Sequence, residues 1–172
     1  MMATELRALG VNLSYSPCAD IHSNPSNPVI NQRAFGQSAR DVAESVCIFA
    51  EALRKGGVVP CAKHFPGHGD TGVDSHYALP VVARTLAELR KQEFVPFVAL
   101  IAAGVEMIMS AHLMVPAIDE TNQATLSSAI MRRTLRDELS FRGITIADAL
   151  GMKAIHETLS SGAFAERAHA AG

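Results

Sequence analysis

Residues 63–76 concentrate side chains that can do acid–base chemistry or bind a metal ion. The segment reads Lys-His-Phe-Pro-Gly-His-Gly-Asp-Thr-Gly-Val-Asp-Ser-His, so three histidines, two aspartates and a lysine stand among three glycines and a proline. Glycine and proline set the backbone of a loop, while imidazole and carboxylate groups titrate and coordinate ions. The segment directly follows the apolar residues 57–62. Polar groups that begin where a buried strand ends are typical of the active sites of α/β enzymes.

Three other predicted strands also end in polar residues. Residues 11–18 form an extended run that ends at Asp20, residues 106–110 lead to His112, and residues 144–147 end at Asp148. A strand over residues 58–62 precedes Lys63. The carboxyl ends of parallel strands meet at one edge of a sheet, so the pattern predicts that these polar residues gather at one place.

Helical patterns separate the predicted strands. Ser38 and Asp41 resemble a capping pair at the start of the first helix, and Gly56 provides its C-terminal stop. Thr85 and Glu88 form a capping box for the second helix, which Pro96 should kink or split. The capping signals therefore place a helix after each of the first two strands.

The third helix should begin at Ser127 or Ser128, and a final helix near Ala149, with an alanine-rich helical stretch over residues 163–172. This alternation implies parallel strands joined by helical crossovers. A site supplied by every strand fits a (β/α)8 barrel better than a doubly wound sheet, whose ligand lies at one switch point. Because such barrels need roughly 250 residues, the chain predicts an α/β fold that is a partial TIM barrel of about four to five βα units.

Composition narrows the function classes. The chain has 172 residues, 48% hydrophobic residues and a formal net charge of −2. The hydrophobic content argues against disorder. The slightly negative net charge argues against a basic surface that binds nucleic acid or an anionic membrane. No apolar run is long enough to span a bilayer, and no signal segment opens the chain. The cysteines Cys18, Cys47 and Cys61 lack metal-ligand spacing, so we expect reduced core thiols and a cytoplasmic location.

Four motifs, in order, resemble glycoside hydrolase family 3, in its β-N-acetylglucosaminidase (β-hexosaminidase) branch of the peptidoglycan-recycling type. Residues 63–76 resemble the signature of that branch, and residues 5–13 its helix entering an inner strand. Residues 31–36 resemble its substrate-binding arginine segment, and residues 141–152 its nucleophile strand. The resemblance covers nearly the whole chain and implies that residues 1–172 are part of a single N-terminal barrel domain, truncated at both ends.

The resemblance implies a role for each matching residue. Asp148 matches the catalytic nucleophile, His76 the acid/base on a mobile loop, and Asp74 the partner of that histidine. Arg33, Lys63 and His64 match residues that bind the sugar hydroxyls or the N-acetyl group, and His112 is a further residue that could line the pocket. The family implies a carbohydrate containing N-acetylglucosamine as the partner, with no cofactor and no metal.

The chemistry of these residues agrees with such roles. A carboxylate at a strand end, such as Asp148, is held rigidly enough to attack an anomeric carbon. The His76 imidazole titrates near neutrality, so it can protonate a leaving oxygen and later deprotonate water. Asp74 could fix the tautomer of His76 and favour its protonated form. The expected activity is that of a retaining exo-β-N-acetylglucosaminidase, which releases terminal N-acetylglucosamine from muropeptides or chitooligosaccharides by double displacement.

Each residue also has a simpler explanation. Asp148 could cap the following helix, and Asp74 with His76 could form a surface ion pair. Lys63 and Arg33 could be solvated charges, His64 could be a satisfied near-core histidine, and a structural role for His112 fits equally well. We expect His68 and Asp70 to hold the shape of the loop, and Met107, Met109 and Met114 to fill the core.

Three alternative functions stay open at this point. The protein would be a metal-dependent hydrolase if a divalent metal bound to His64, His68, Asp70, Asp74 and His76. Pro66 and the glycines argue against a helical His-x-x-x-His pair of ligands, because they break any helix. A barrel fragment could also be inactive alone. A phosphorolytic variant is possible as well, because a histidine acid/base leaves no carboxylate to repel an incoming phosphate.

Overall fold

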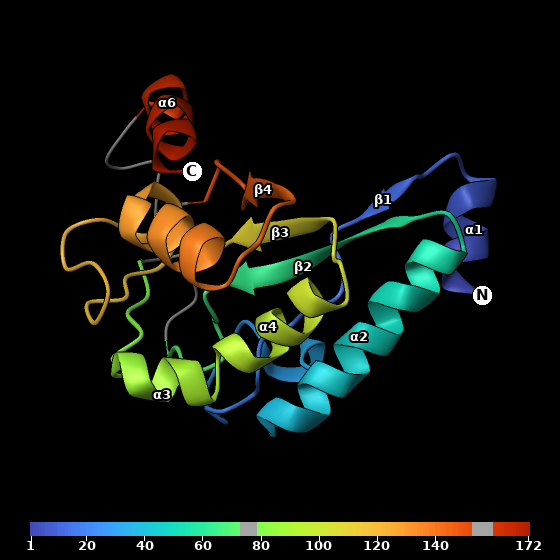
Figure 1. Cartoon of the computed structure of the whole chain (residues 1–172), viewed down its shortest axis with the longest axis horizontal. Helices are drawn as coiled ribbons and strands as arrows, with labels where there is room; N and C mark the ends of the chain where they lie inside the picture. The colour runs from blue at the N-terminus through green and yellow to red at the C-terminus, as the bar shows by residue number, and fades with distance from the viewer. Residues whose placement is uncertain (73–78, 153–159) are drawn as a thin grey trace.

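Four parallel strands lie side by side in the order in which they occur in the chain (Figure 1). The computed structural model describes residues 1–72, 79–152 and 160–172. The strands are β1 (Leu13–Ser14), β2 (Val59–Phe65), β3 (Met107–Ser110) and β4 (Ile144–Ala147). The register pairs Leu13 with Val59, Cys61 with Met107, and Met107 with Ile144. A doubly wound sheet would reverse its strand order at a switch point, so this order confirms the partial (β/α)8 barrel.

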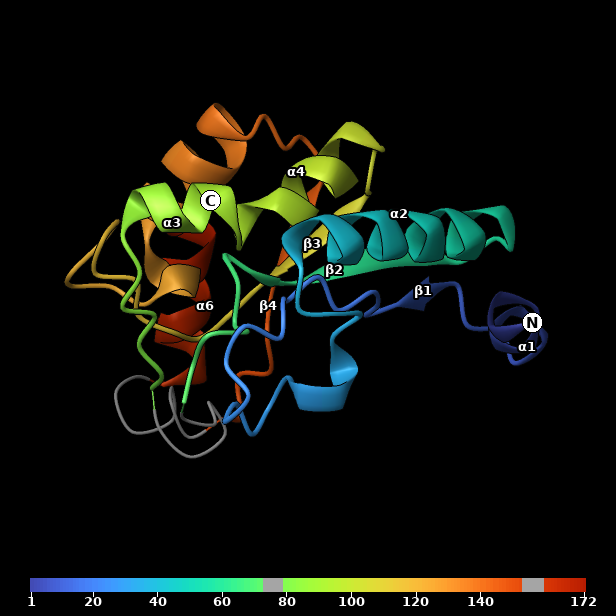
Figure 2. The same cartoon turned by 90° about the horizontal axis from the view of Figure 1, so that it is seen from below.

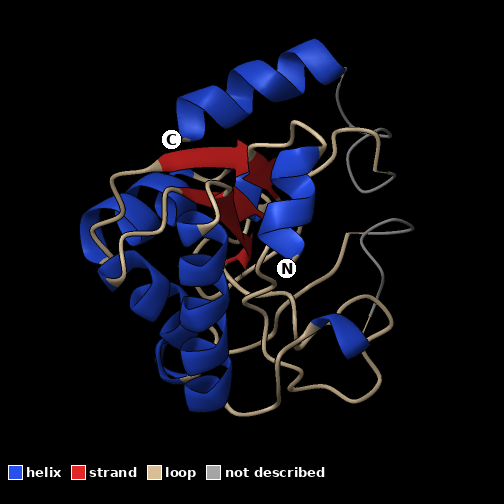
Figure 3. Ribbon diagram, turned by 90° about the vertical axis from the view of Figure 1, so that its right-hand side faces the viewer, coloured by secondary structure: helices blue, strands red, loops and turns tan. Residues whose placement is uncertain are grey.

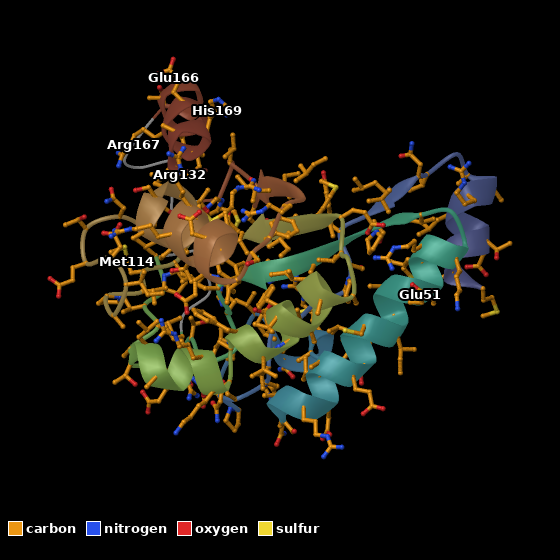
Figure 4. The ribbon with its side chains drawn as sticks, in the orientation of Figure 1. Glu51, Met114, Arg132, Glu166, Arg167 and His169 are labelled. Atoms are coloured by element: carbon orange, nitrogen blue, oxygen red, sulfur yellow. The ribbon has the colours of Figure 1, made fainter. Side chains whose placement is uncertain are left out.

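Helix α2 (Ala39–Lys55) forms the crossover from β1 to β2. Its buried stripe repeats at helical spacing and consists of Val42, Val46, Ala50 and Leu53. The Asp41 backbone N–H donates to Ser38 Oγ at 3.5 Å, and Gly56 follows the last helical residue, as the sequence predicts. Glu51, labelled in Figure 4, pairs with Arg54, which also reaches Glu106 Oε1 at 2.7 Å and so joins α2 to the start of β3.

The second crossover is split into α3 (Leu86–Lys91) and α4 (Phe94–Ala102). The Thr85–Glu88 capping box is present, with both of its hydrogen bonds. Pro96 lies in the first turn of α4, where its missing N–H has no partner to lose. Figure 2 shows α2, α3 and α4 on one side of the strands, so they cover the outer face of the sheet.

The third crossover differs from an ordinary α-helix. It comprises η2 (Ala124–Leu126) and η3 (Ala129–Glu138), and η3 is wound as a π-helix, so the Leu139 N–H bonds to Thr134 O, five residues back. Ser127 Oγ accepts a hydrogen bond from the Ile130 N–H at 3.3 Å, so Ser127 provides the cap and Ser128 does not. The sequence predicted this helix but not its wider winding.

The other described helices lie before β2 and after β4. Helix α1 (Met2–Ala8) precedes β1, and the short helix η1 (Asn31–Arg33) lies in the loop after β1. Residues 149–152 are not helical, and residues 153–159, over which the helix predicted to start near Ala149 would continue, lie outside the described residues. The last described helix is α6 (Ser161–Ala171), which confirms the alanine-rich helix and packs beside η2 and η3, beyond β4 (Figure 3).

Apolar side chains fill both faces of the sheet. The larger core lies between the strands and their helices and includes Ala62, Phe65 and Ile108. A second layer on the inner face contains Cys61, Met107 and Met109, which confirms these two methionines as core residues, whereas Met114 is only half-buried. Among the described helices, none combines the length and the apolar character that a membrane span requires.

Candidate active site

A pocket of about 300 Å³ opens at the carboxyl ends of the strands. Four of the predicted site residues, which come from three separate parts of the chain, line it together. The lining consists of Tyr15, Val29, Arg33, Lys63, His64, His68, Met109, Ile146, Ala147, Asp148 and Ala149. A guanidinium, an ammonium, two imidazoles and a carboxylate thus face one small cavity, which can hold a polar ligand through several hydrogen bonds.

Asp148 lies directly after β4, and its backbone continues the sheet. The Asp148 N–H donates to Ser110 O at 3.2 Å, and Asp148 Oδ1 accepts from the Ala149 N–H at 2.7 Å. The side chain is 24% exposed, so a ligand in the pocket can reach the carboxylate. Since residues 149–152 are not helical, capping a helix that starts there does not explain this aspartate.

The His64 imidazole lies between two carboxylates and a guanidinium. Its Nδ1 is 2.6 Å from Asp20 Oδ2, and its Nε2 is 3.3 Å from an Arg33 guanidinium nitrogen and 3.9 Å from Asp148 Oδ2. In the neutral form of the ring, Nδ1–H donates to Asp20 and the lone pair of Nε2 accepts from Arg33. His64 therefore connects the buried Asp20 to the wall of the pocket.

The Asp20 carboxylate, whose role the sequence left open, accepts hydrogen bonds from several groups. Its Oδ1 accepts from the His68 N–H at 2.6 Å, and its Oδ2 accepts from the His64 N–H at 3.2 Å and from Cys18 Sγ at 3.3 Å. Burial raises the pKa of Asp20, but the charge and hydrogen bond of His64, together with His68, outweigh burial and lower the pKa to about 2. An ionised carboxylate thus holds the start of the loop that follows β2.

Lys63 is fixed through its backbone. The Lys63 N–H donates to Pro17 O at 3.1 Å, and Lys63 O accepts from the Ala19 N–H at 2.6 Å. The pairing of β2 with β3 shifts between Lys63 and Phe65, and this irregularity lets Lys63 and His64 face the same pocket although they are adjacent in sequence. The peptide bond between these two residues is cis.

The loop after β2 is held by side chains from the segment after β1. Asn27 Nδ2 donates to His68 O at 2.8 Å and to Gly69 O at 3.0 Å. Thr71 Oγ1 is 2.7 Å from His68 Nδ1, so His68 supports the loop shape as predicted, while it also lines the pocket. Gly69 packs against the backbone of Ile21, and a Cβ at this position would lie 1.6 Å from Ile21 O.

Asp70 has a more distant partner than the sequence suggested. Its Oδ1 is 3.0 Å from an Arg84 guanidinium nitrogen, so the carboxylate bridges to a residue 14 positions later. Asp74 and His76, the predicted acid/base pair, lie outside the described residues.

His112 lies behind the pocket wall. Its side chain is buried, Nδ1 is 2.9 Å from Thr125 Oγ1, and the ring meets Phe164 edge-on. It is absent from the described pocket lining, so its position favours the structural role over contact with a ligand. Burial lowers the pKa of His112 despite the opposing influence of Asp148.

Tyr15 lines the pocket and was missed by sequence reasoning. A signal for it existed, because Tyr15 is two positions after Leu13, whose side chain packs on the inner layer of the sheet. Alternate residues of an extended strand share a face, so Tyr15 follows Leu13 toward the barrel interior.

The described residues do not bring the proposed metal ligands of the loop together. His64 bonds to Asp20, His68 bonds to Thr71, and Asp70 pairs with Arg84. Within the described part of the chain, Cys18, Asp20 and His64 are the group that could hold an ion. The 2.6 Å contact between His64 Nδ1 and Asp20 Oδ2 is a direct hydrogen bond, which is shorter than the separation of two ligands around one zinc ion, about 3.3 Å or more. Burial and the nearby Asp20 charge also raise the pKa of the Cys18 thiol, which opposes thiolate formation.

Comparisons with known proteins show which proteins the chain resembles. A β-hexosaminidase A from Pseudoalteromonas piscicida is 40% identical over 89% of the chain, which covers 28% of that protein. A solved glycoside hydrolase family 3 β-N-acetylglucosaminidase from Paenibacillus sp. str. FPU-7 matches with a TM-score of 0.98 and 42% identity, over 99% of this chain and 33% of that one. NagZ from Neisseria gonorrhoeae, solved with N-trifluoroacetyl-D-glucosamine, matches with a TM-score of 0.89 and 34% identity, over 99% of this chain and 49% of that one.

The chain thus spans less than half of the length of each of these relatives. The model of the glycosyl hydrolase family 3 N-terminal domain matches residues 1–172. This match includes every strand that supplies the pocket and the whole loop after β2. With the four strands in barrel order and a carboxylate at the end of β4, the chain belongs to glycosyl hydrolase family 3, within its N-terminal domain.

Proposed function

We propose that the protein is a retaining exo-β-N-acetylglucosaminidase. The observation that carries this proposal is the position of Asp148, whose carboxylate lies at a strand end in the same pocket as Arg33, Lys63 and His64. A partly exposed carboxylate among hydrogen-bond donors suits attack on a sugar that the donors hold in place. The pocket volume of about 300 Å³ is at the lower end for a ligand site, which suits one terminal sugar.

The proposed reaction has two displacement steps. Asp148 attacks the anomeric carbon, and the glycosidic bond breaks while His76 gives its proton to the leaving oxygen. The resulting glycosyl ester on Asp148 is then attacked by water, and His76 takes the proton from that water. Two inversions give net retention at the anomeric carbon. Asp74 would orient His76 and favour its protonated form.

Binding of the sugar falls to the cationic wall of the pocket. Arg33 offers a planar fork of donors, and Lys63 offers a mobile ammonium group, so together they can hold hydroxyl groups or an N-acetyl carbonyl. His64 Nε2 lies within reach of the same space. Asp20 holds the opposite side of that ring and so prevents it from rotating.

The substrate class follows from the relatives. They are named β-hexosaminidase or β-N-acetylglucosaminidase, and one of them is solved with an N-acylated glucosamine. We therefore propose terminal N-acetylglucosamine as the sugar, with muropeptides or chitooligosaccharides as the source and peptidoglycan recycling as the setting. The free cysteines support a reducing, cytoplasmic location as part of the same proposal.

Trapping of the intermediate tests the proposal. The full-length protein is incubated with an activated 2-fluoro or 5-fluoro analogue of N-acetylglucosamine and then digested for peptide mass spectrometry. A sugar adduct on Asp148 is the expected result. An adduct on another residue, or none while the protein still cleaves an aryl N-acetylglucosaminide, would overturn the assignment. Assays with and without inorganic phosphate distinguish hydrolysis from phosphorolysis.

A further inference from the structure

Arg84 connects two acidic residues beneath the loop that follows β2. One of its terminal guanidinium nitrogens lies 3.0 Å from Asp70 Oδ1, and its Nε lies 3.2 Å from Glu93 Oε1. The other terminal nitrogen donates to Gln92 Oε1 at 2.7 Å. The Arg84 side chain is 20% exposed, and none of these residues belongs to the described lining of the pocket. The guanidinium thus joins three side chains outside that lining.

Asp70 and Arg84 lie at the two ends of one segment of the chain. Residues 71–83, which contain Asp74 and His76, connect the two partners of the ion pair. Each end of this segment is also tied to the barrel by backbone groups. Asn24 Nδ2 donates to Asp70 O at 3.3 Å, and the Val82 N–H donates to Met114 O at 2.9 Å. The Asp70–Arg84 pair joins the two ends directly to each other.

The buried Glu93 side chain holds Arg84 in place through an ion pair. This side chain is 1% exposed, and neither carboxylate oxygen has a hydrogen-bond partner among the described residues, so the ion pair with Arg84 is the described contact that compensates for burial. Gly67 packs directly on this side chain, because a Cβ at Gly67 would lie 2.7 Å from Glu93 Cβ. A buried carboxylate with so few partners is costly to keep, which points to a role beyond stability.

We propose that Arg84 is a positioning residue for the acid/base His76, and that it acts by holding Asp70 and Glu93 so that both ends of residues 71–83 are fixed relative to Asp148. This inference rests on the proposed glycosidase function. Proton transfer to a leaving oxygen depends steeply on the distance and angle of the acid. Removal of Arg84 should therefore weaken protonation of the leaving group, while attack by Asp148 itself is unaffected.

The test is leaving-group dependence in the full-length protein. Arg84→Met is compared with the unaltered protein on aryl N-acetylglucosaminides whose phenol leaving groups differ in pKa. We expect kcat/KM to fall about 10- to 100-fold with a poor leaving group, and less than about 3-fold with dinitrophenol, which departs without a proton. Asp70→Asn should give the same pattern. An equal loss with every leaving group would overturn the proposal, because misfolding or lost binding does not distinguish among phenols.

A double-mutant cycle separates positioning from a general effect. If Arg84 acts through His76, Arg84→Met should cost less than about 2-fold when His76→Ala is already present. Additive losses would show that Arg84 acts on something other than the acid, and would end the proposal. Arg90→Met is the matched control, because Arg90 pairs with Glu138 at 2.8 Å on the surface of α3. This control should leave the leaving-group dependence unchanged.

Two further measurements keep the outcome interpretable. Thermal unfolding monitored by circular dichroism shows whether Arg84→Met folds, and Arg84→Lys keeps the charge but loses the simultaneous contact with both acids. If Arg84→Met does not fold, Asp70→Asn and Arg84→Lys take its place. An equal loss of kcat/KM with every leaving group in both variants contradicts the proposal. Fluorosugar labelling of Asp148 reports on the glycosidase function itself, so labelling that persists in Arg84→Met separates the two hypotheses.

Discussion

Asp20 and His64 form a buried hydrogen bond of 2.6 Å between Oδ2 and Nδ1, and this bond fixes the ring so that Nε2 faces Arg33 and Asp148. Asp20 is 1% exposed and His64 is 4% exposed, so water does not compete for the contact. The carboxylate that organises the pocket therefore does not itself line it. The residue follows the first strand, far from the loop that it holds.

Replacing Asp20 should reduce both stability and activity. Asp20→Asn removes a charged acceptor of two backbone N–H groups and one imidazole, so we expect the free energy of unfolding to fall by about 1–3 kcal/mol. Because the ring of His64 loses its anchor, kcat/KM should fall by about 10- to 100-fold. Urea unfolding and steady-state kinetics measure the two effects. Asp119→Asn is the control, since Asp119 accepts several hydrogen bonds away from the pocket and should change stability alone.

Asp148 is expected to be indispensable for the first chemical step. Asp148→Asn and Asp148→Ala should abolish the covalent adduct and lower kcat by a factor on the order of 10⁴, because the nucleophile is missing. Mass spectrometry after fluorosugar trapping and rapid-quench kinetics give the readout. Asp137→Asn, on the exposed surface of η3, is the matched control and should retain the activity of the unaltered protein. Normal turnover by either Asp148 variant would contradict the proposed mechanism.

His76 should affect the two steps according to the leaving group. His76→Ala removes the proton donor, so kcat/KM should fall by about 10²- to 10⁴-fold for substrates with poor leaving groups and much less for dinitrophenyl glycosides. Breakdown of the glycosyl ester should slow with every substrate, because deprotonation of water is then unassisted. A pre-steady-state burst with the activated substrate would reveal this. A uniform loss in the first step would rule out His76 as the acid.

Gly69 should tolerate no side chain. A Cβ there would overlap Ile21 O at 1.6 Å, and backbone atoms cannot rotate away as a flexible side chain can. We expect Gly69→Ala to lower the free energy of unfolding by about 3 kcal/mol or more, or to prevent folding. Gly162→Ala in α6 is the control, because no described atom lies within 4 Å of the added carbon and alanine favours a helix. Equal melting temperatures for the two variants would refute the close approach.

Glu93 should make stability fall as pH rises. Burial raises the pKa of Glu93 from 4.5 to about 7, against the influence of Arg84. Between these pH values the folded state binds more protons than the unfolded state, so ionisation costs folding free energy progressively from pH 4.5 to about pH 7 and fully above it. This contribution amounts to about 1–3 kcal/mol.

The variant Glu93→Gln tests this contribution because glutamine does not titrate. Urea unfolding from pH 5 to pH 8 should show that the stability of the unaltered protein, relative to the variant, falls across this range. A difference in stability that stays constant with pH would mean that Glu93 titrates in the folded state as it does in the unfolded chain.

Much of the fold could be predicted because its signals are local. Capping residues such as Ser38 and Thr85 bond to N–H groups three residues away, so their geometry is contained within a short stretch of sequence. The convergence of Asp148, Lys63 and His64 followed from the rule that parallel strands end at one edge. Arg33 joined them through its resemblance to a family motif rather than through any periodicity.

The contacts that hold the site were not predictable in this way. The pairs Asp20–His64 and Asp70–Arg84 join residues 44 and 14 positions apart, and only the register of the assembled strands brings them together. For His112 the sequence left a pocket role and a structural role open. The contacts that favour the structural role come from Thr125 and Phe164, which meet His112 only in the folded chain.

Two buried cysteine thiols can report on local unfolding of the strands. Cys18 donates to Asp20 next to the pocket, and Cys61 lies in the inner layer of the sheet, where burial raises its pKa to about 12. Neither sulfur forms a reactive thiolate while the strands stay packed. The rate at which a maleimide modifies these cysteines should therefore report how often the strands separate, which makes alkylation a simple measure of local unfolding next to the pocket.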